Sequence, residues 1–139
     1  MDIREYLGMC SKLDGIINSK LEYLERLKSL IYKTSNMSDV RVSDSSKDNT
    51  ERLIVKIIDL QDEINRDIDS LVDLKREIRE LISKVEPFEL RSILDLKYVC
   101  GLRLEDVALK LNYSIRHIMR LHAKALSEAE KQHIKRKGR

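Results

Sequence analysis

The sequence contains few of the residues that build β-sheets and tight turns. Its 139 residues include no tryptophan, one phenylalanine, one proline and four glycines, and aromatic residues make up 4% of the chain. β-Sandwiches and barrels need many aromatic and β-branched strand residues and frequent Gly- or Pro-containing turns. Leu, Ile, Lys, Glu and Arg are abundant instead, and most of them favour helices. We therefore predict an all-α protein.

Cysteine is scarce too, and neither cysteine belongs to a metal-binding pattern. Cys10 and Cys100 lie far apart and share no ligand-like spacing with a histidine, whereas a zinc site needs about four clustered ligands. We expect no metal and no cofactor, and we expect both thiols to be buried. The chain also lacks a Gly-rich phosphate loop and a nucleophile beside a plausible base, so enzyme activity is not expected.

Long apolar runs are missing as well. The sequence has no stretch of about 18 apolar residues that could span a membrane. The start, at residues 1–5, is acidic and helical in character, which is unlike a signal peptide. We expect a cytoplasmic protein without a membrane partner.

Helical periodicity is what the first part of the chain does contain. Apolar residues recur at intervals of three and four over residues 2–33 and again over 50–85, with a polar loop at 34–49 between them. Asn49 or Thr50 is a suitable N-cap for the second stretch. Two amphipathic helices of matching length should fold back as a long antiparallel hairpin. The two stripes consist of Ile3, Leu7, Cys10, Leu13, Ile17, Leu21, Leu24, Leu27 and Ile31, and of Leu53, Ile57, Leu60, Ile64, Ile68, Leu71, Leu74, Ile78, Leu81 and Val85.

A hairpin of two helices would leave apolar surface uncovered. Six further apolar residues widen the stripes beyond a two-helix seam, so the C-terminal domain or a second copy of the chain must cover them. We favour self-association, with residues 1–85 as an oligomerisation arm and a dimer as the favoured assembly. The six residues are Ile16, Leu30, Ile54, Ile58, Val72 and Ile82.

Positive charge is concentrated in the remaining part of the chain. Residues 87–139 hold twelve Lys or Arg against six Asp or Glu, whereas residues 1–86 hold fifteen against eighteen. This asymmetry indicates an anion-facing end and a structural end. We predict a three-helix domain over residues 86–130, whose first helix begins at Pro87, and a basic tail at 131–139 that frays.

Residues 104–126 have the pattern of a DNA-binding helix-turn-helix. A helix over 104–111 should be followed by a turn in which Asn112 tolerates the left-handed conformation. Ser114 should then cap a third helix at 114–126. The residues expected to be buried are Leu104, Val107, Ala108 and Leu111 in the second helix, Tyr113 beneath the turn, and Ile118, Leu121, Ala125 and Leu126 in the third helix.

Residues 87–126 resemble region 4 of the sigma-70 family of transcription initiation factors. The likeness is greatest to small phage proteins that carry this module alone, including ArpU-like and RinA-like regulators of late gene transcription. It implies a sequence-specific transcription regulator of a phage or prophage, acting in a bacterial cell or a phage-infected host. Double-stranded DNA would be its partner, with RNA polymerase as a second candidate. The matching segments are Leu94-Asp95-Leu96-Lys97-Tyr98 before Gly101, Leu104-Glu105-Asp106-Val107-Ala108, Leu111-Asn112-Tyr113-Ser114 and Ala123-Lys124-Ala125-Leu126.

The resemblance also implies which residues face DNA, because region 4 places the outward side of its third helix in the major groove. Physical chemistry supports part of this set independently. Arg116 and Arg120 lie four positions apart on one helix face, and arginine can bond bidentately to guanine. Arg103 stands where this family usually has a capping Ser or Thr. The predicted DNA-binding residues are Arg103, Ser114, Ile115, Arg116, His117, Met119, Arg120 and Lys124.

Other interpretations of the same pattern stay open. Basic residues on one helix also suit an ordinary solvated face. Small-terminase-like DNA packaging proteins combine a helix-turn-helix with long oligomerising helices, and a ring-shaped oligomer would favour that class. A third alternative is a protein that binds RNA polymerase or a sigma factor without reading DNA itself.

Overall fold

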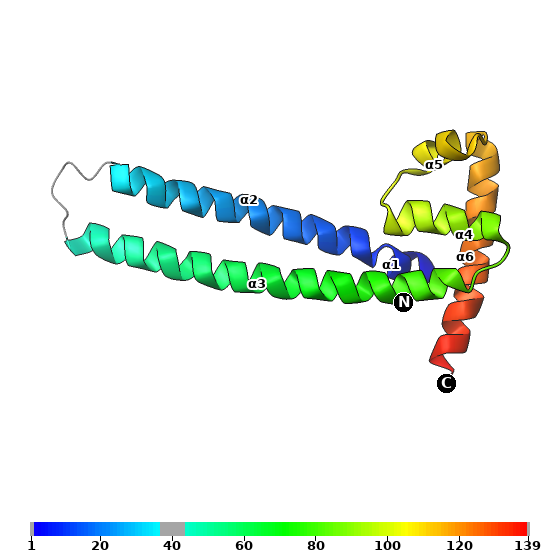
Figure 1. The fold of residues 1–139 in the computed structure, drawn as a ribbon, viewed down its shortest axis with the longest axis horizontal. Helices are drawn as coiled ribbons and strands as arrows, with labels where there is room; N and C mark the ends of the chain where they lie inside the picture. Colours follow the sequence, from blue (N-terminus) through cyan, green and yellow to red (C-terminus); the bar gives the residue numbers. More distant parts are fainter. Residues whose placement is uncertain (1, 37–43, 139) are drawn as a thin grey trace. The chain divides into compact units, whose positions relative to one another are not determined.

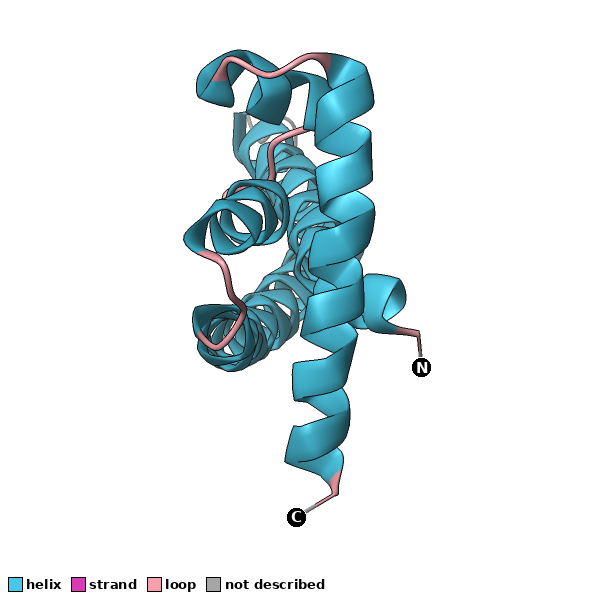
Figure 2. Cartoon of the chain, turned by 90° about the vertical axis from the view of Figure 1, so that its right-hand side faces the viewer, coloured by secondary structure: helices cyan, strands magenta, loops and turns pink. Residues whose placement is uncertain are grey.

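The structure is a computed structural model that describes residues 2–36 and 44–138. Within these two ranges every regular element is a helix and no strand occurs (Figure 2). The prediction of an all-α fold is confirmed. The elements are α1 (Ile3–Leu7), α2 (Met9–Asn36), α3 (Asp44–Ser83), α4 (Phe88–Leu94), the π-helical turn η1 (Asp95–Val99), α5 (Leu104–Leu111) and α6 (Ile115–Lys137).

Residues 13–70 form one of two compact units, in which α2 and α3 lie side by side as an antiparallel hairpin (Figure 1). The seam between the helices packs Leu24 and Leu27 against Leu60 and Ile64, and all four side chains are buried. Burial of such side chains contributes roughly 1.5–3 kcal/mol each. The predicted hairpin is confirmed.

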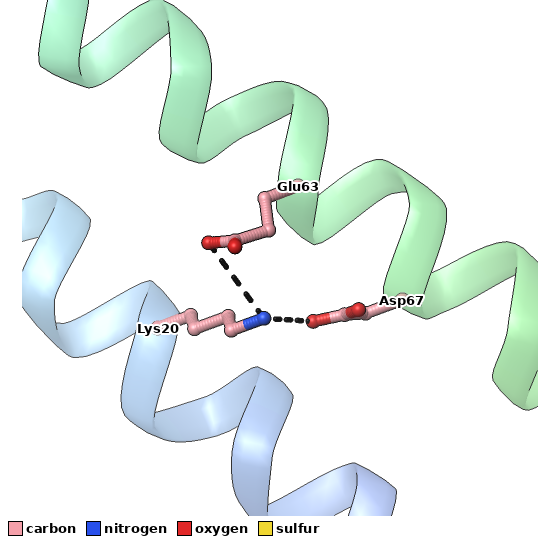
Figure 3. Close-up of polar contacts among 3 residues, drawn as sticks. All are labelled: Lys20, Glu63 and Asp67. Carbon is pink, nitrogen blue, oxygen red and sulfur yellow. Dashed lines mark hydrogen bonds and ion pairs between the residues drawn. The ribbon is translucent and has the colours of Figure 1, made fainter.

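A layer of ion-paired side chains interrupts this apolar seam. The Lys20 Nζ atom lies 2.5 Å from Asp67 Oδ2 and 3.7 Å from Glu63 Oε2, so one ammonium group bridges two carboxylates of α3 (Figure 3). The side chains of Lys20 and Asp67 are only 27% and 23% exposed. Leu21 and Ile68 follow Lys20 and Asp67 directly, and although the stripe pattern places both in the seam, each is 40% exposed.

The helix predicted for residues 2–33 is divided in the structure. α1 ends at Leu7 and α2 begins at Met9, with Gly8 between them. The Gly8 N–H donates to the Arg4 carbonyl oxygen at 3.0 Å. A Cβ at Gly8 would lie 3.2 Å from the same oxygen, so a larger residue would be crowded at this break.

The inner ends of the two long helices extend further than predicted. α2 continues to Asn36, and α3 begins at Asp44 rather than at residue 50. Asn49 and Thr50 are therefore residues within a helix and not its caps. Residues 37–43 of the predicted polar loop lie outside the described residues.

The second compact unit contains residues 2–12 and 71–138. Within it α1, α4 and α5 each pack against α6. Its core includes Leu7, Ile78 and Ile118, which are all 0% exposed. The ends of the hairpin, residues 2–12 and 71–83, thus fall in the same compact unit as the three helices α4, α5 and α6.

The basic C-terminal segment is helical in the structure, so the prediction that it frays is wrong. α6 continues through it to Lys137, and both Ala129 and His133 are buried. The His133 ring stacks on Tyr6 of α1, with the ring centroids 4.6 Å apart. Packing against α1 therefore extends the helix beyond the end that the sequence suggested.

Two predicted burial states are also corrected. Ile82, assigned to the uncovered apolar surface, is 2% exposed because the end of α3 contributes to the second unit's core. Cys10 is buried as predicted, whereas Cys100 is exposed. Cys100 lies at the surface because it follows η1 directly and precedes Gly101, whose φ of 76° turns the chain toward α5.

Candidate nucleic-acid interface

The turn between α5 and α6 adopts the predicted geometry. Asn112 has φ 60° and ψ 42°, in the left-handed region. The Ser114 Oγ atom accepts a hydrogen bond from the His117 N–H at 3.1 Å, so Ser114 is the N-cap of α6. The Tyr113 N–H donates to the Ala108 carbonyl oxygen at 2.9 Å and closes the end of α5. Asn112 and Ser114 therefore have the conformational roles that the sequence predicted for them.

A small apolar core holds α5 and α6 together at this turn. Leu104 and Leu111 were expected in it but are only half-buried, because they lie at the two ends of a short helix where fewer neighbours cover them. The remaining helix residues expected there are buried: Val107, Ala108, Ile118, Leu121, Ala125 and Leu126.

The side of α6 that faces away from this core is cationic and exposed. Arg116, Arg120 and Lys124 follow one another at intervals of four and are all exposed. Ile115 and Met119 lie beside them and are 53% and 58% exposed. The helix contains no acidic residue before Glu128, so this face has charge of one sign over more than three turns.

His117 and Arg103 lie at the margins of that face. His117 is half-buried, and its ring meets Tyr113 edge to face with centroids 4.9 Å apart. Arg103 is exposed at the N-terminus of α5 and makes no side-chain capping hydrogen bond. The structure thus gathers Ser114 to Lys124 along the start of α6 and places Arg103 at the start of the preceding helix.

Tyr113 is half-buried and does not form the predicted plug beneath the turn. Its hydroxyl group donates to Glu89 Oε1 of α4. This hydrogen bond raises the pKa of Tyr113 above its ordinary value, with burial as a second cause. Tyr113 therefore links the turn to α4 through its hydroxyl group. A ring buried in the apolar core would have no carboxylate partner of this kind.

A pocket of about 890 Å³ in the second compact unit adjoins the exposed face of α6. Met119 and Ala123 of α6 form part of its wall, and Arg103 lies at its α5 side. The pocket also contains residues that sequence reasoning did not select. These are Arg4 from α1, Lys12 from α2, and Lys97, Tyr98 and His122 from the three-helix domain. No spacing or motif in the sequence connects residues 4 and 12 with residue 103.

Tyr98 and His122 line one wall of this pocket as a bonded pair. The Tyr98 Oη and His122 Nε2 atoms are 2.8 Å apart. Burial lowers the pKa of His122 to about 4, and the positive charges of Lys97 and Arg4 add to this effect. The imidazole is therefore neutral near pH 7. Burial likewise raises the pKa of Tyr98.

Among residues 2–36 and 44–138, no group of three or more His, Cys, Asp or Glu side chains could hold a metal ion. None of the helices there combines the length and the apolar character that crossing a membrane requires.

Comparison with protein families gives a match over more than half of the chain. Residues 30–130 match the family model described as "Protein of unknown function (DUF1492)". The matched range contains every residue predicted to contact DNA, and it excludes Arg4 and Lys12. Comparisons with curated proteins and with solved structures gave no match.

Proposed function

We propose that this chain, which belongs to the DUF1492 family, is a DNA-binding transcription regulator that reads the major groove with the exposed face of α6. The observation that carries the proposal is the exposed row of Arg116, Arg120 and Lys124 on α6, the helix that Ser114 caps directly after the turn. The resemblance of residues 87–126 to region 4 of sigma-70 factors supports the same assignment, because region 4 reads promoter DNA with the corresponding helix. RNA polymerase is a candidate partner on the strength of that resemblance alone.

The α6 face offers the groups that base and phosphate recognition need. Arg116 and Arg120 can each donate two hydrogen bonds to O6 and N7 of a guanine. The N-terminus of α6, beside Ser114, has N–H groups and the positive end of the helix dipole, which attract phosphate. Lys124 adds a positive charge on the same face. Ile115 and Met119 can contact thymine methyl groups.

We further propose that the hairpin joins two copies of the chain. Ile16 and Tyr23 of α2 are each 49% exposed, and Ile54 and Ile58 of α3 are 44% and 51% exposed. A second copy that covered these side chains would remove apolar surface from water, which is favourable. A dimer would also contain two α6 helices, and dimeric helix-turn-helix proteins bind two half-sites.

Selection from a random-sequence DNA library with the purified full chain tests the main proposal. We expect a defined motif, and we expect Arg116→Ala and Arg120→Ala each to weaken binding to it by about 1–3 kcal/mol. Lys135→Ala, at an exposed position near the other end of α6, is the matched control and should leave the sequence preference unchanged. A selection without any motif, or wild-type binding by both arginine variants, would rule the proposal out.

A further inference from the structure

Four cations and no carboxylate line the pocket beside α6. Arg4, Lys12, Lys97 and Arg103 come from α1, α2, η1 and the residue before α5. A cleft with charge of one sign and apolar walls concentrates its electric field and attracts counter-ions. The walls here are largely apolar, with Leu7, Leu102 and Leu104 among the lining residues. The pocket is therefore suited to an anion.

The charges of two of these cations act on the pocket wall itself. Lys97 and Arg4 line the pocket together with His122, and their positive charges help to lower the pKa of that ring. The Lys97 Nζ atom also lies 5.6 Å from the centroid of the Tyr98 ring, an arrangement that holds the ammonium group at the pocket. Arg4, Lys12 and Arg103 are exposed and accessible to a large ligand.

The pocket is continuous with the face of α6 proposed to enter the groove. Ala123 lines the pocket. At about 100° per residue around the helix, Ala123 lies within about 60° of both Arg116 and Arg120. Met119, on the other side of Ala123, is both a pocket residue and a predicted DNA contact. A ligand that covers Arg116 can therefore extend over the pocket.

We infer that Arg4, Lys12 and Lys97, together with Arg103, bind phosphates of the DNA strand that borders the groove read by α6. The major groove is only about 12 Å wide, so a helix inside it has phosphate backbone close on either side. Such contacts orient a protein on DNA without reading its sequence. The inference rests on the proposed function, and it assigns to the N-terminal residues a role that lies outside the helix-turn-helix.

Salt-dependent binding of the full chain tests this inference. Arg4→Ala, Lys12→Ala and Lys97→Ala would be measured against the selected duplex and a scrambled duplex between 50 and 200 mM salt. We expect each substitution to weaken binding to both duplexes by the same factor and to reduce the slope of log K against log salt by about 1. Lys12→Arg keeps the charge and should keep the slope.

Arg26→Ala and Lys33→Ala are the matched controls, because both positions are exposed on α2 and neither lines the pocket. They should leave affinity and slope unchanged. Thermal unfolding of each variant, followed by circular dichroism, establishes that the fold is retained. Arg4 and Lys12 are exposed, so their removal should not shift the melting temperature.

The outcomes separate the inference from the function on which it rests. If the wild-type chain binds neither duplex, the proposed function itself fails and the inference falls with it. If the wild type binds its motif and Arg116→Ala weakens it, but the pocket variants keep the wild-type slope, then only the inference is overturned. A change of sequence preference in the pocket variants would also overturn it, because phosphate contacts carry no base information.

Discussion

Tyr98 and His122 are joined by a hydrogen bond of 2.8 Å between Oη and Nε2, and their rings stack with centroids 5.8 Å apart. His122 is 6% exposed and Tyr98 is half-buried, so this bond lies in the wall of the pocket beside α6. Its surroundings favour the neutral imidazole, since burial and two nearby cations disfavour the charged form.

The first prediction concerns stability against pH. The pKa of His122 falls from 6.5 to about 4 on folding. Between these values the unfolded chain binds a proton that the folded chain does not, so the stabilisation is complete above about pH 6.5 and is lost as the pH falls toward 4. At about 1.4 kcal/mol for each pH unit, the loss should reach roughly 2–3 kcal/mol. Urea unfolding at pH 7 and pH 4.5 measures it.

His122→Gln is the control for that measurement. Glutamine keeps a hydrogen-bonding group near Tyr98 but does not titrate. Burial also lowers the pKa of His133, so both proteins retain the contribution of that residue to acid sensitivity. The difference between the two curves isolates His122. Parallel curves for the wild type and the variant would show that His122 does not titrate as its surroundings indicate.

The second prediction compares two isoleucines of α6. Ile118 is 0% exposed, whereas Ile134 is 63% exposed. Ile118→Ala should lower the free energy of unfolding by about 2–5 kcal/mol, because it leaves a cavity in the core of the second compact unit. Ile134→Ala should change it by no more than about 0.5 kcal/mol. Equal effects in chemical denaturation would contradict the packing described for this helix.

The third prediction concerns the cap of α6. Ser114→Ala removes the acceptor of the His117 N–H and should destabilise the protein by about 1 kcal/mol. Ser127→Ala changes an exposed serine inside the same helix and should be neutral or slightly stabilising, since alanine is the better helix former. Thermal unfolding of the pair measures the difference. A Ser114→Ala protein as stable as Ser127→Ala would mean that the cap contributes nothing.

Features that depend on neighbouring residues could be predicted from the sequence. Asn112 and Ser114 act through their own backbone and the next few residues, so their side-chain chemistry alone indicated the turn and the cap. The hairpin could be predicted for a similar reason, because apolar residues recur at intervals of three and four along both of its helices. The exposed row from Arg116 to Lys124 followed from helical geometry once the turn had been placed.

Features that depend on distant residues could not be predicted in this way. Lys20 replaces an apolar residue in the seam because Asp67 and Glu63 lie opposite it, and that register emerges only when the two helices are paired. The pocket beside α6 is a stronger case, because Arg4 and Lys97 line the same pocket only when α1 packs against α6. The periodicity of residues 2–33 assigns α1 to the hairpin, and it contains no information about the packing of α1 against α6.

The last prediction concerns the exposed apolar residues of the hairpin. Ile54 and Ile58 lie one turn apart on α3 and are 44% and 51% exposed. If they form an interface between two copies, Ile54→Glu/Ile58→Glu should weaken self-association more than about a hundredfold, since burial of each isoleucine contributes roughly 1.5–3 kcal/mol. Sedimentation equilibrium measures the association constant.

Lys56→Gln/Arg66→Gln is the control for charge. It changes the net charge by the same amount at exposed positions around the helix and removes no apolar side chain, so it should leave association intact. A wild-type chain that stays monomeric at high micromolar concentration would exclude the dimer, and equal weakening by both double variants would attribute association to charge rather than to apolar burial.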